Sequence, residues 1–290
     1  MAGNRFEEIV GSVDALPTLP TVVAKVNELV DDTSVSAGDI NEVISHDIAL
    51  SSKILKLVNS AYYGFPRRIS SITHAVVILG FQTIRNIAVS AFVLDAFEGG
   101  GTLFGHRGFW IHSVGVGVAA NVVGQRQRLP ASEEAFMCGL LHDVGKLVLN
   151  QFARKDFARV LELARAEDIT VLEAEGRVLG TSHAEVGAML LERWKLPQRM
   201  VAAIGGHHRP ESAPEEARVL TAAIHVGDIV TRALLVGSGG DEKIPTVSAE
   251  AWTALGLSEE ALPGMLQEIS SDMTKVGAFI ELVQASKSAR

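Results

Sequence analysis

An apolar stretch near the middle of the chain carries three ionisable side chains, and this combination constrains the fold more than any other feature. Apolar residues in the segment 137–149 recur at the three- and four-residue spacing of a helix, not at the two-residue spacing of a strand. The same segment contains His142, Asp143 and Lys146. Burying such groups costs free energy unless they are paired or bound to a metal. The stretch therefore predicts a buried helix whose polar groups have partners.

Two interpretations of these three residues remain open on this stretch alone. In the first, His142 and Asp143 are hydrogen-bonded inside the helix and Lys146 lies at the surface. In the second, both side chains reach a metal held over the face between them, because imidazole and carboxylate donors suit Zn, Mn or Fe. Lys146 follows His142 by four residues and Asp143 by three, so it lies on the same side and can meet an anion at that metal.

Length and composition favour an all-α protein with a large core. The chain has 290 residues, of which 47% are hydrophobic and 6% aromatic. Segments with a 3.6-residue period dominate, which indicates helices throughout. The net charge of −8 argues against broad nucleic-acid binding, because it implies no basic surface.

The sequence predicts a cytoplasmic protein without a membrane span. Its one cysteine, Cys138, excludes a disulfide framework and suits a reducing compartment. The N-terminal residues lack the apolar core of a signal peptide. The longest apolar stretch, 75–97, is interrupted by polar residues at 82, 85, 86 and 95, which favours a buried helix pair over a span.

Turn signals divide the chain into four regions. A helical lobe covers residues 1–98, and the glycine-rich stretch 99–105 is the clearest hinge. Residues 106–235 carry most of the histidines and form the second lobe. Residues 236–290 begin as a polar segment and continue as helices that we expect to dock on the body of the protein.

Three further histidines are interpreted as structural. His46 precedes a second aspartate at a helix junction, where Asp47 serves as an N-cap. His74 lies near the start of its own helix and has no companion. His225 lies one turn before Asp228 on the same face, and we expect it to pack beside the site and not to replace a ligand.

Four motifs in the first third of the chain resemble those of the HDOD family, the HD-related output domains of bacterial signalling. They are Leu16-Pro-Thr-Leu-Pro20, the segment 47–61 with its Asn59-Ser60-Ala61 end, Ile69-Ser-Ser-Ile72, and Ala75-Val-Val-Ile-Leu-Gly80. The resemblance extends over residues 14–230. It implies an all-helical fold in which an N-terminal helical lobe packs on a lobe similar to HD-superfamily phosphohydrolases. It does not imply catalysis, since many members have lost the metal ligands and act as regulatory output or scaffold modules.

The second lobe resembles the HD-GYP cyclic-dinucleotide phosphodiesterases in the order of its histidines and aspartates. Carried over position by position, this resemblance implies metal ligands at His112, His142, Asp143, His183, His207, His208 and Asp228. It also implies catalytic roles for Asp143, which bridges the ions, and for Lys146 on a substrate phosphate. We expect these side chains to converge on a divalent transition metal, as two ions of Fe, Mn, Ni or Zn.

Two departures from the HD-GYP pattern bear on activity. Residues 209–212 read Arg-Pro-Glu-Ser where those enzymes have Gly-Tyr-Pro, and Gly108 stands where trinuclear members have a glutamate. A third metal and cyclic di-GMP as the substrate are therefore disfavoured. Two functions stay open, a bacterial signalling module with a structural or sensory metal site and a metal-dependent phosphohydrolase of nucleotides or cyclic dinucleotides. We favour the signalling module, with a signalling protein as partner, a nucleotide as a further candidate ligand, and neither nucleic acid nor membrane as a partner.

Overall fold

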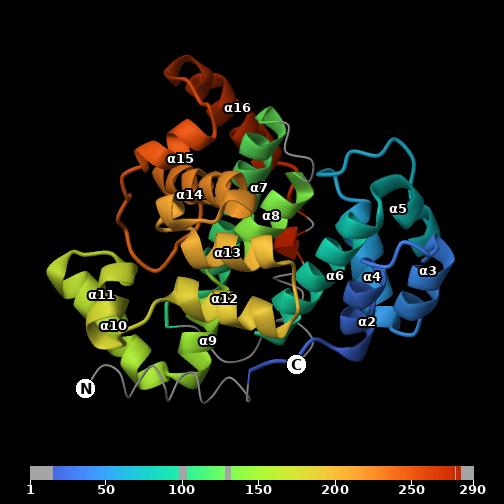
Figure 1. Cartoon of the computed structure of the whole chain (residues 1–290), viewed down its shortest axis with the longest axis horizontal. Coiled ribbons are helices and arrows are strands. Elements are labelled where there is room, and N and C mark those ends of the chain that lie inside the picture. The colour runs from blue at the N-terminus through green and yellow to red at the C-terminus, as the bar shows by residue number, and fades with distance from the viewer. Residues whose placement is uncertain (1–15, 98–102, 128–131, 278, 282–290) are drawn as a thin grey trace. The chain divides into compact units, whose positions relative to one another are not determined.

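The computed structural model describes residues 16–97, 103–127, 132–277 and 279–281. These residues form α-helices and short 3-10 helices, and no strand occurs among them (Figure 1). The predicted all-α fold is therefore confirmed. None of the helices in these ranges has both the length and the apolar character to cross a bilayer. Residues 99–102 of the predicted hinge lie outside the described ranges.

The chain divides into two compact units. The histidine-rich unit contains the described residues of 99–269, and the N-terminal unit contains those of 17–98 together with those from 270 onward. The division falls within α16 (Leu262–Met273). The segment 236–290 is thus shared between the two units.

The N-terminal unit is built from short amphipathic helices. They are α2 (Thr21–Leu29), α3 (Ala37–Ser45), α4 (Ile48–Val58), α5 (Ile72–Leu79) and α6 (Phe81–Ala96). Their apolar faces supply a core that includes the buried side chains of Val26, Ile40, Ile54 and Leu57. Gly80 separates α5 from α6. Its φ of 82° is a backbone conformation that residues with a Cβ rarely adopt.

Side-chain caps begin three of these helices, α3, α4 and α5, and in α5 the cap is Ser71. Ser36 and Asp39 form a capping box at the start of α3. Asp47 accepts a hydrogen bond of 2.9 Å from the backbone N–H of Leu50 and caps α4, as the sequence predicts. The neighbouring His46 is exposed, with Nδ1 2.7 Å from the carbonyl oxygen of Glu42. This His-Asp pair therefore has a local structural role.

The histidine-rich unit is larger. Its helices are α7 (His106–Arg126), α8 (Ser132–Leu141), α9 (Val144–Phe152), α10 (Arg154–Glu167), α11 (Val171–Val178), α12 (His183–Arg193), α13 (Gln198–Gly206), α14 (Arg218–Ala233), α15 (Ala249–Ala254) and the first part of α16. α7 packs against both α8 and α14, as Figure 1 shows. A Cβ on Gly139 of α8 would lie 2.7 Å from the Cα of Gly117 on α7, so two glycines allow this close contact.

Candidate metal centre

The predicted helix through residues 137–149 is interrupted at the His-Asp pair. α8 ends at Leu141 and α9 begins at Val144, so His142 and Asp143 lie in the turn between them, and the expectation of one continuous helix is wrong. Adjacent side chains on a helix diverge by about 100°. At this turn, Nε2 of His142 and Oδ2 of Asp143 instead approach to 3.2 Å. The turn thus directs both side chains to one point.

The structure brings the predicted ligands together from five parts of the unit. They are His112 on α7, His142 and Asp143 at the α8–α9 turn, His183 at the start of α12, His207 and His208 at the end of α13, and Asp228 on α14. Three groups of these residues could hold a metal, because the donor atoms within each group all lie within 4.8 Å of one another. The groups are His112–His142–Asp228, His142–Asp143–His207 and His183–His207–His208. All of these residues are buried except His208, which is half-buried.

Asp143 occupies the middle of this cluster. Its Oδ2 lies 3.2 Å from Nε2 of His142 and 4.0 Å from Nε2 of His112, whereas its Oδ1 lies 3.1 Å from Nε2 of His183. The two oxygens of one carboxylate therefore face two different groups of imidazoles. Nε2 of His183 in turn lies 2.8 Å from Nε2 of His208. On the other side, Nε2 of His112 lies 3.0 Å from Oδ1 of Asp228.

Several donor atoms in the cluster have no hydrogen-bond partner in the described part of the chain. They are Nε2 of His112, of His142 and of His207, and Oδ1 of Asp143. Buried polar atoms are rarely left in this state, because each costs about 1–3 kcal/mol of desolvation. These atoms belong to residues whose donor atoms lie within 4.8 Å of one another in overlapping groups, and their chemistry is that of a borderline N/O metal site. The residues present therefore fit a divalent transition metal.

The outer nitrogens of three of the imidazoles are held by acceptors. Nδ1 of His142 lies 2.7 Å from the carbonyl oxygen of Gly139, and Nδ1 of His207 lies 2.6 Å from the carbonyl oxygen of Ile204. In His183, Nδ1 lies 2.7 Å from Oε2 of the buried Glu175. When Nδ1 of such a ring carries the proton, this N–H donates to the acceptor, and the lone pair of Nε2 faces the centre. Such outer partners orient histidines that bind metals.

The two aspartates are ionised in this environment. Burial, the largest influence, acts to raise the pKa of Asp143, but His142 and Lys146 together hold that pKa well below its usual range. Burial likewise acts to raise the pKa of Asp228, and Arg232 outweighs it, so this pKa also lies well below its usual range. The centre thus contains two carboxylates that remain charged.

The imidazoles respond to burial in the opposite sense. It lowers the pKa of His112, and it holds the pKa values of His207 and His208 well below the usual range. In His183 burial again acts to lower the pKa, but the carboxylate of Glu175 reverses this and the pKa is raised. Neutral imidazoles offer a lone pair, which is the form that binds a metal.

Two buried cations balance the carboxylates. Nζ of Lys146 donates to Oδ2 of Asp143 at 2.8 Å and to the carbonyl oxygen of Gly239 at 2.7 Å, and the side chain is 1% exposed. Nε of Arg232 donates to Oδ1 of Asp228 at 2.9 Å. The ammonium predicted to meet a substrate phosphate thus faces a protein carboxylate and a backbone carbonyl here.

A glycine-rich segment, 237–241, lies against the centre. Gly237 has φ 69°, and a Cβ on it would overlap the backbone N–H of His112. A Cβ on Gly239 would lie 3.4 Å from Nε2 of His112. Oδ1 of Asp241 accepts from the guanidinium of Arg232 at 2.8 Å. The segment therefore covers the ligands on this side.

Sequence reasoning did not identify Glu175, Arg232 or the 237–241 segment as part of the centre. Arg232 follows Asp228 by one helical turn, which is a detectable signal for an ion pair. No local pattern links Glu175 to His183 or the glycines to Lys146. His225 is placed as expected beside the site, because its Nδ1 lies 2.9 Å from the carbonyl oxygen of His207 and its Nε2 accepts from the N–H of Ser248 at 3.0 Å.

The fold and site define an all-helical protein with a buried histidine–aspartate centre. The HDOD domain model matches residues 16–210. The chain therefore belongs to the HDOD family.

Solved structures and a curated sequence are also similar to this chain. One similar crystal structure is that of an HDOD domain protein of unknown function from Geobacter sulfurreducens. Its sequence is 28% identical to this chain and the two structures have a TM-score of 0.76, over 99% of this chain and 97% of that one. A provisionally named phosphohydrolase from Shewanella amazonensis SB2B is 26% identical with a TM-score of 0.73, over 96% of this chain and 97% of that one. An uncharacterised protein of Treponema pallidum (strain Nichols) is 28% identical over 82% of this chain, which spans only 46% of that protein.

Proposed function

We propose that this chain is a regulatory module of bacterial signal transduction that binds divalent transition metal in its buried histidine–aspartate centre. The observation that carries the proposal is the set of three overlapping groups of buried or half-buried histidine and aspartate donor atoms, each within 4.8 Å, in which several atoms have no hydrogen-bond partner among the described residues. Metal ions held by these groups would satisfy the unpartnered atoms.

The proposal extends to two ions, because the two oxygens of Asp143 face different histidines. His112, His142 and Asp228 would hold one ion, and His183, His207 and His208 the other, with Asp143 shared. Imidazole and carboxylate donors accept Fe, Mn, Ni or Zn. Asp143 and Asp228 supply the negative charge, and the neutral imidazoles of His207 and His208 supply lone pairs.

A structural or sensory role for the metal follows from how the centre is enclosed. Its buried ligands are no more than 2% exposed, and Lys146 is engaged by Asp143 and by Gly239. Burial of every proposed ligand except the half-buried His208 suits a structural ion better than a catalytic one, which keeps a position open for substrate. We therefore assign the output to binding of a signalling protein, in a cytoplasmic setting that suits the single cysteine, with no role for nucleic acid or membrane.

Metal analysis of protein purified without added metal tests the proposal. We expect one to two equivalents of a transition metal in the unaltered chain and none after His142→Ala with Asp143→Ala. His46→Ala is the matched control, because His46 is exposed and outside the centre. Absence of metal from the unaltered chain, also after incubation with Mn, Fe, Ni and Zn, would contradict the proposal.

A metal-dependent phosphohydrolase is the second candidate. It is favoured by the shared Asp143 with its adjacent Lys146, and by the name of the Shewanella amazonensis relative. Bound divalent ions would supply an activated water and neutralise phosphoryl charge. A panel of phosphomonoesters, nucleotides and cyclic dinucleotides with Mn, Fe and Co decides between the two. Turnover above roughly 1 s⁻¹, lost in the double variant, establishes the enzyme, and silence with metal present supports the regulatory module.

A further inference from the structure

A pocket in the N-terminal unit lies between the second half of α4 and the segment 65–70 that leads into α5. Its volume is about 900 Å³. Sites for small organic ligands commonly have volumes of about 300–1,000 Å³. The pocket is formed by the Asn59-Ser60 motif and its surroundings, none of which takes part in the metal centre.

The walls of this pocket carry positive charge and hydroxyl groups. Ser52 and Lys56, one helical turn apart on α4, line one side, and Arg68 and Ser70 line the other. No carboxylate is among the described residues that line it. In a chain with 34 acidic and 26 basic residues, a pocket with two cations and no acid favours an anionic ligand.

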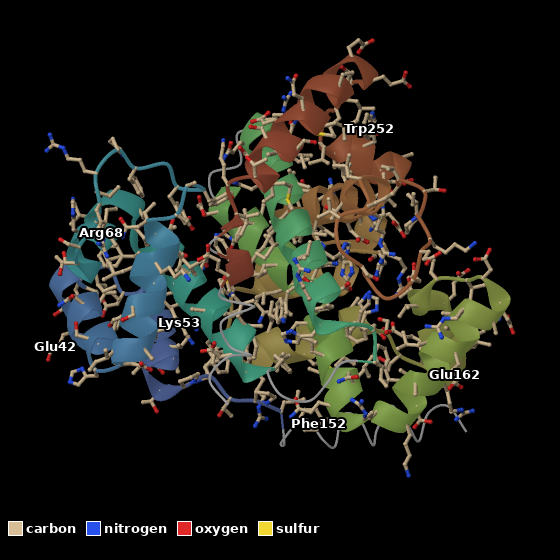
Figure 2. All side chains as sticks on the ribbon, turned by 180° about the vertical axis from the view of Figure 1, so that it is seen from behind. Glu42, Lys53, Arg68, Phe152, Glu162 and Trp252 are labelled. Atoms are coloured by element: carbon tan, nitrogen blue, oxygen red, sulfur yellow. The ribbon has the colours of Figure 1, made fainter. Side chains whose placement is uncertain are left out.

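Both cations are available to a ligand. Arg68 is exposed and has neither a hydrogen bond nor an ion pair with any described residue; Figure 2 labels it in the N-terminal unit. Nζ of Lys56 lies 3.1 Å from Oε2 of Glu281, but the two side chains are 43% and 65% exposed. Exposed pairs of this kind contribute little free energy, so a phosphate can replace the carboxylate of Glu281.

Asn59 fixes the two walls relative to each other. Its side-chain N–H groups donate to the carbonyl oxygens of Leu55 and Ile69 at 2.8 and 2.7 Å, and its Oδ1 accepts from the N–H of Ile69 at 2.7 Å. The amide thereby ties the backbone next to Arg68 to the end of α4. A binding site arranged before the ligand arrives loses less entropy on binding.

Two further groups complete the pocket. Ser60 is 8% exposed, and its hydroxyl has no hydrogen-bond partner among the described residues. Phe65 presents a ring that stacks on Tyr63 with an interplanar angle of 2° and centroids 6.3 Å apart. The hydroxyl is buried behind the pocket surface, whereas the ring of Phe65 lines the pocket and offers a flat apolar wall to a ring.

We propose that this pocket binds a small phosphorylated organic ligand of nucleotide size, with its phosphate between Lys56 and Arg68 and its ring against Phe65. Charge-assisted hydrogen bonds from these two cations supply the affinity. Asn59 acts as a positioning residue. This site is separate from the proposed metal centre and does not depend on metal.

Calorimetric titration of the full chain with ATP, inorganic pyrophosphate and adenosine tests the proposal. We expect ATP and pyrophosphate to bind and adenosine to bind at least tenfold more weakly than ATP. Lys56→Ala and Arg68→Ala should each weaken ATP binding about tenfold or more, the effect of losing one charge-assisted hydrogen bond. The matched control is Arg67→Ala, since Arg67 is an exposed neighbour that does not line the pocket.

Melting temperatures separate binding from folding. Because Lys56 and Arg68 are exposed, Lys56→Ala and Arg68→Ala should leave the melting temperature of the ligand-free chain unchanged while ATP binding weakens. No binding of ATP or pyrophosphate at about 10 mM overturns the proposal. An equal loss in Arg67→Ala and Arg68→Ala overturns it as well, because it would indicate unspecific attraction by surface charge.

Discussion

Gly145 packs so closely on the backbone of His183 that a Cβ on the glycine would overlap the carbonyl oxygen of the histidine. The same Cβ would lie 2.8 Å from the amide nitrogen of Gly187, one turn further along α12. This contact joins α9 to α12 at the level of the centre, where Oδ1 of Asp143 lies 3.1 Å from Nε2 of His183. The glycine two residues after Asp143 thus sets the distance between two proposed ligands.

Gly145→Ala should therefore impair both fold and metal binding. The methyl group meets backbone, which cannot rotate away, so α9 and α12 must separate. Overpacking of this kind costs about 1–3 kcal/mol or more. We expect a lower urea midpoint and loss of at least half of the bound metal. Gly176→Ala on α11 is the control, because its Cβ meets no atom within 4 Å, and we expect a gain of about 0.5–1 kcal/mol in helix stability there.

Glu175→Gln tests the outer partner of His183. The carboxylate raises the pKa of His183 and orients its ring through a 2.7 Å contact with Nδ1. The amide should lower that pKa in metal-free protein, as followed by NMR, and weaken metal affinity about 10–100-fold. The control is Glu192→Gln, because Glu192 is an exposed residue of α12, the helix that begins at His183. This change should alter neither the pKa of His183 nor the metal affinity. Unchanged affinity in the Glu175 variant would show that His183 is not a ligand.

The capping box of α11 gives a pH-dependent prediction. The backbone N–H and hydroxyl of Thr170 donate to the carboxylate of Glu173 and lower its pKa from the usual 4.5. A lowered folded-state pKa means that this stabilisation is present above pH 4.5 and is lost as the pH falls through the folded-state value. Thr170→Ala should cost about 1 kcal/mol at pH 7. Urea titrations should show this difference shrinking below pH 4.5; a constant difference would contradict it.

Much of the fold could be predicted because it is encoded locally. The stretch 75–97 lies in the helix pair α5 and α6, and Asp47 caps α4 as its position suggests. The family order of histidines also identified the residues that converge around Asp143. In each case, neighbours in sequence or a known order carry the information.

The rest depends on contacts between distant segments. The break at His142 leaves no signal in the sequence, because the apolar period continues through it, whereas α9, which follows the turn, packs against α12. Glu175 and Gly239 reach the centre from segments that have no pattern of ligands. Such outer residues are chosen by three-dimensional fit, so sequence spacing does not identify them.

Arg232→Met probes the charge balance beneath the centre. Nε of Arg232 lies 2.9 Å from Oδ1 of Asp228 and Nη1 lies 2.8 Å from Oδ1 of Asp241, and all three side chains are at most 8% exposed. Burial acts to lower the pKa of Arg232, but the two carboxylates raise it above its ordinary value, so the charge persists at every accessible pH. Methionine keeps most of the volume and removes the charge, which leaves two buried carboxylates without their cation.

We expect this change to lower the free energy of unfolding by about 3–5 kcal/mol, the cost of breaking a buried ion pair from one side. Lys25→Met is the matched control, since the Lys25–Glu28 pair is more than half exposed on both sides and should contribute about 0–1 kcal/mol. Urea unfolding of both variants, with and without added metal, provides the measurement. Added metal should recover part of the loss in Arg232→Met, because a cation bound by Asp228 replaces the missing charge. A loss below about 1 kcal/mol, or no recovery with any metal tested, would show that Asp228 is not held between Arg232 and a metal.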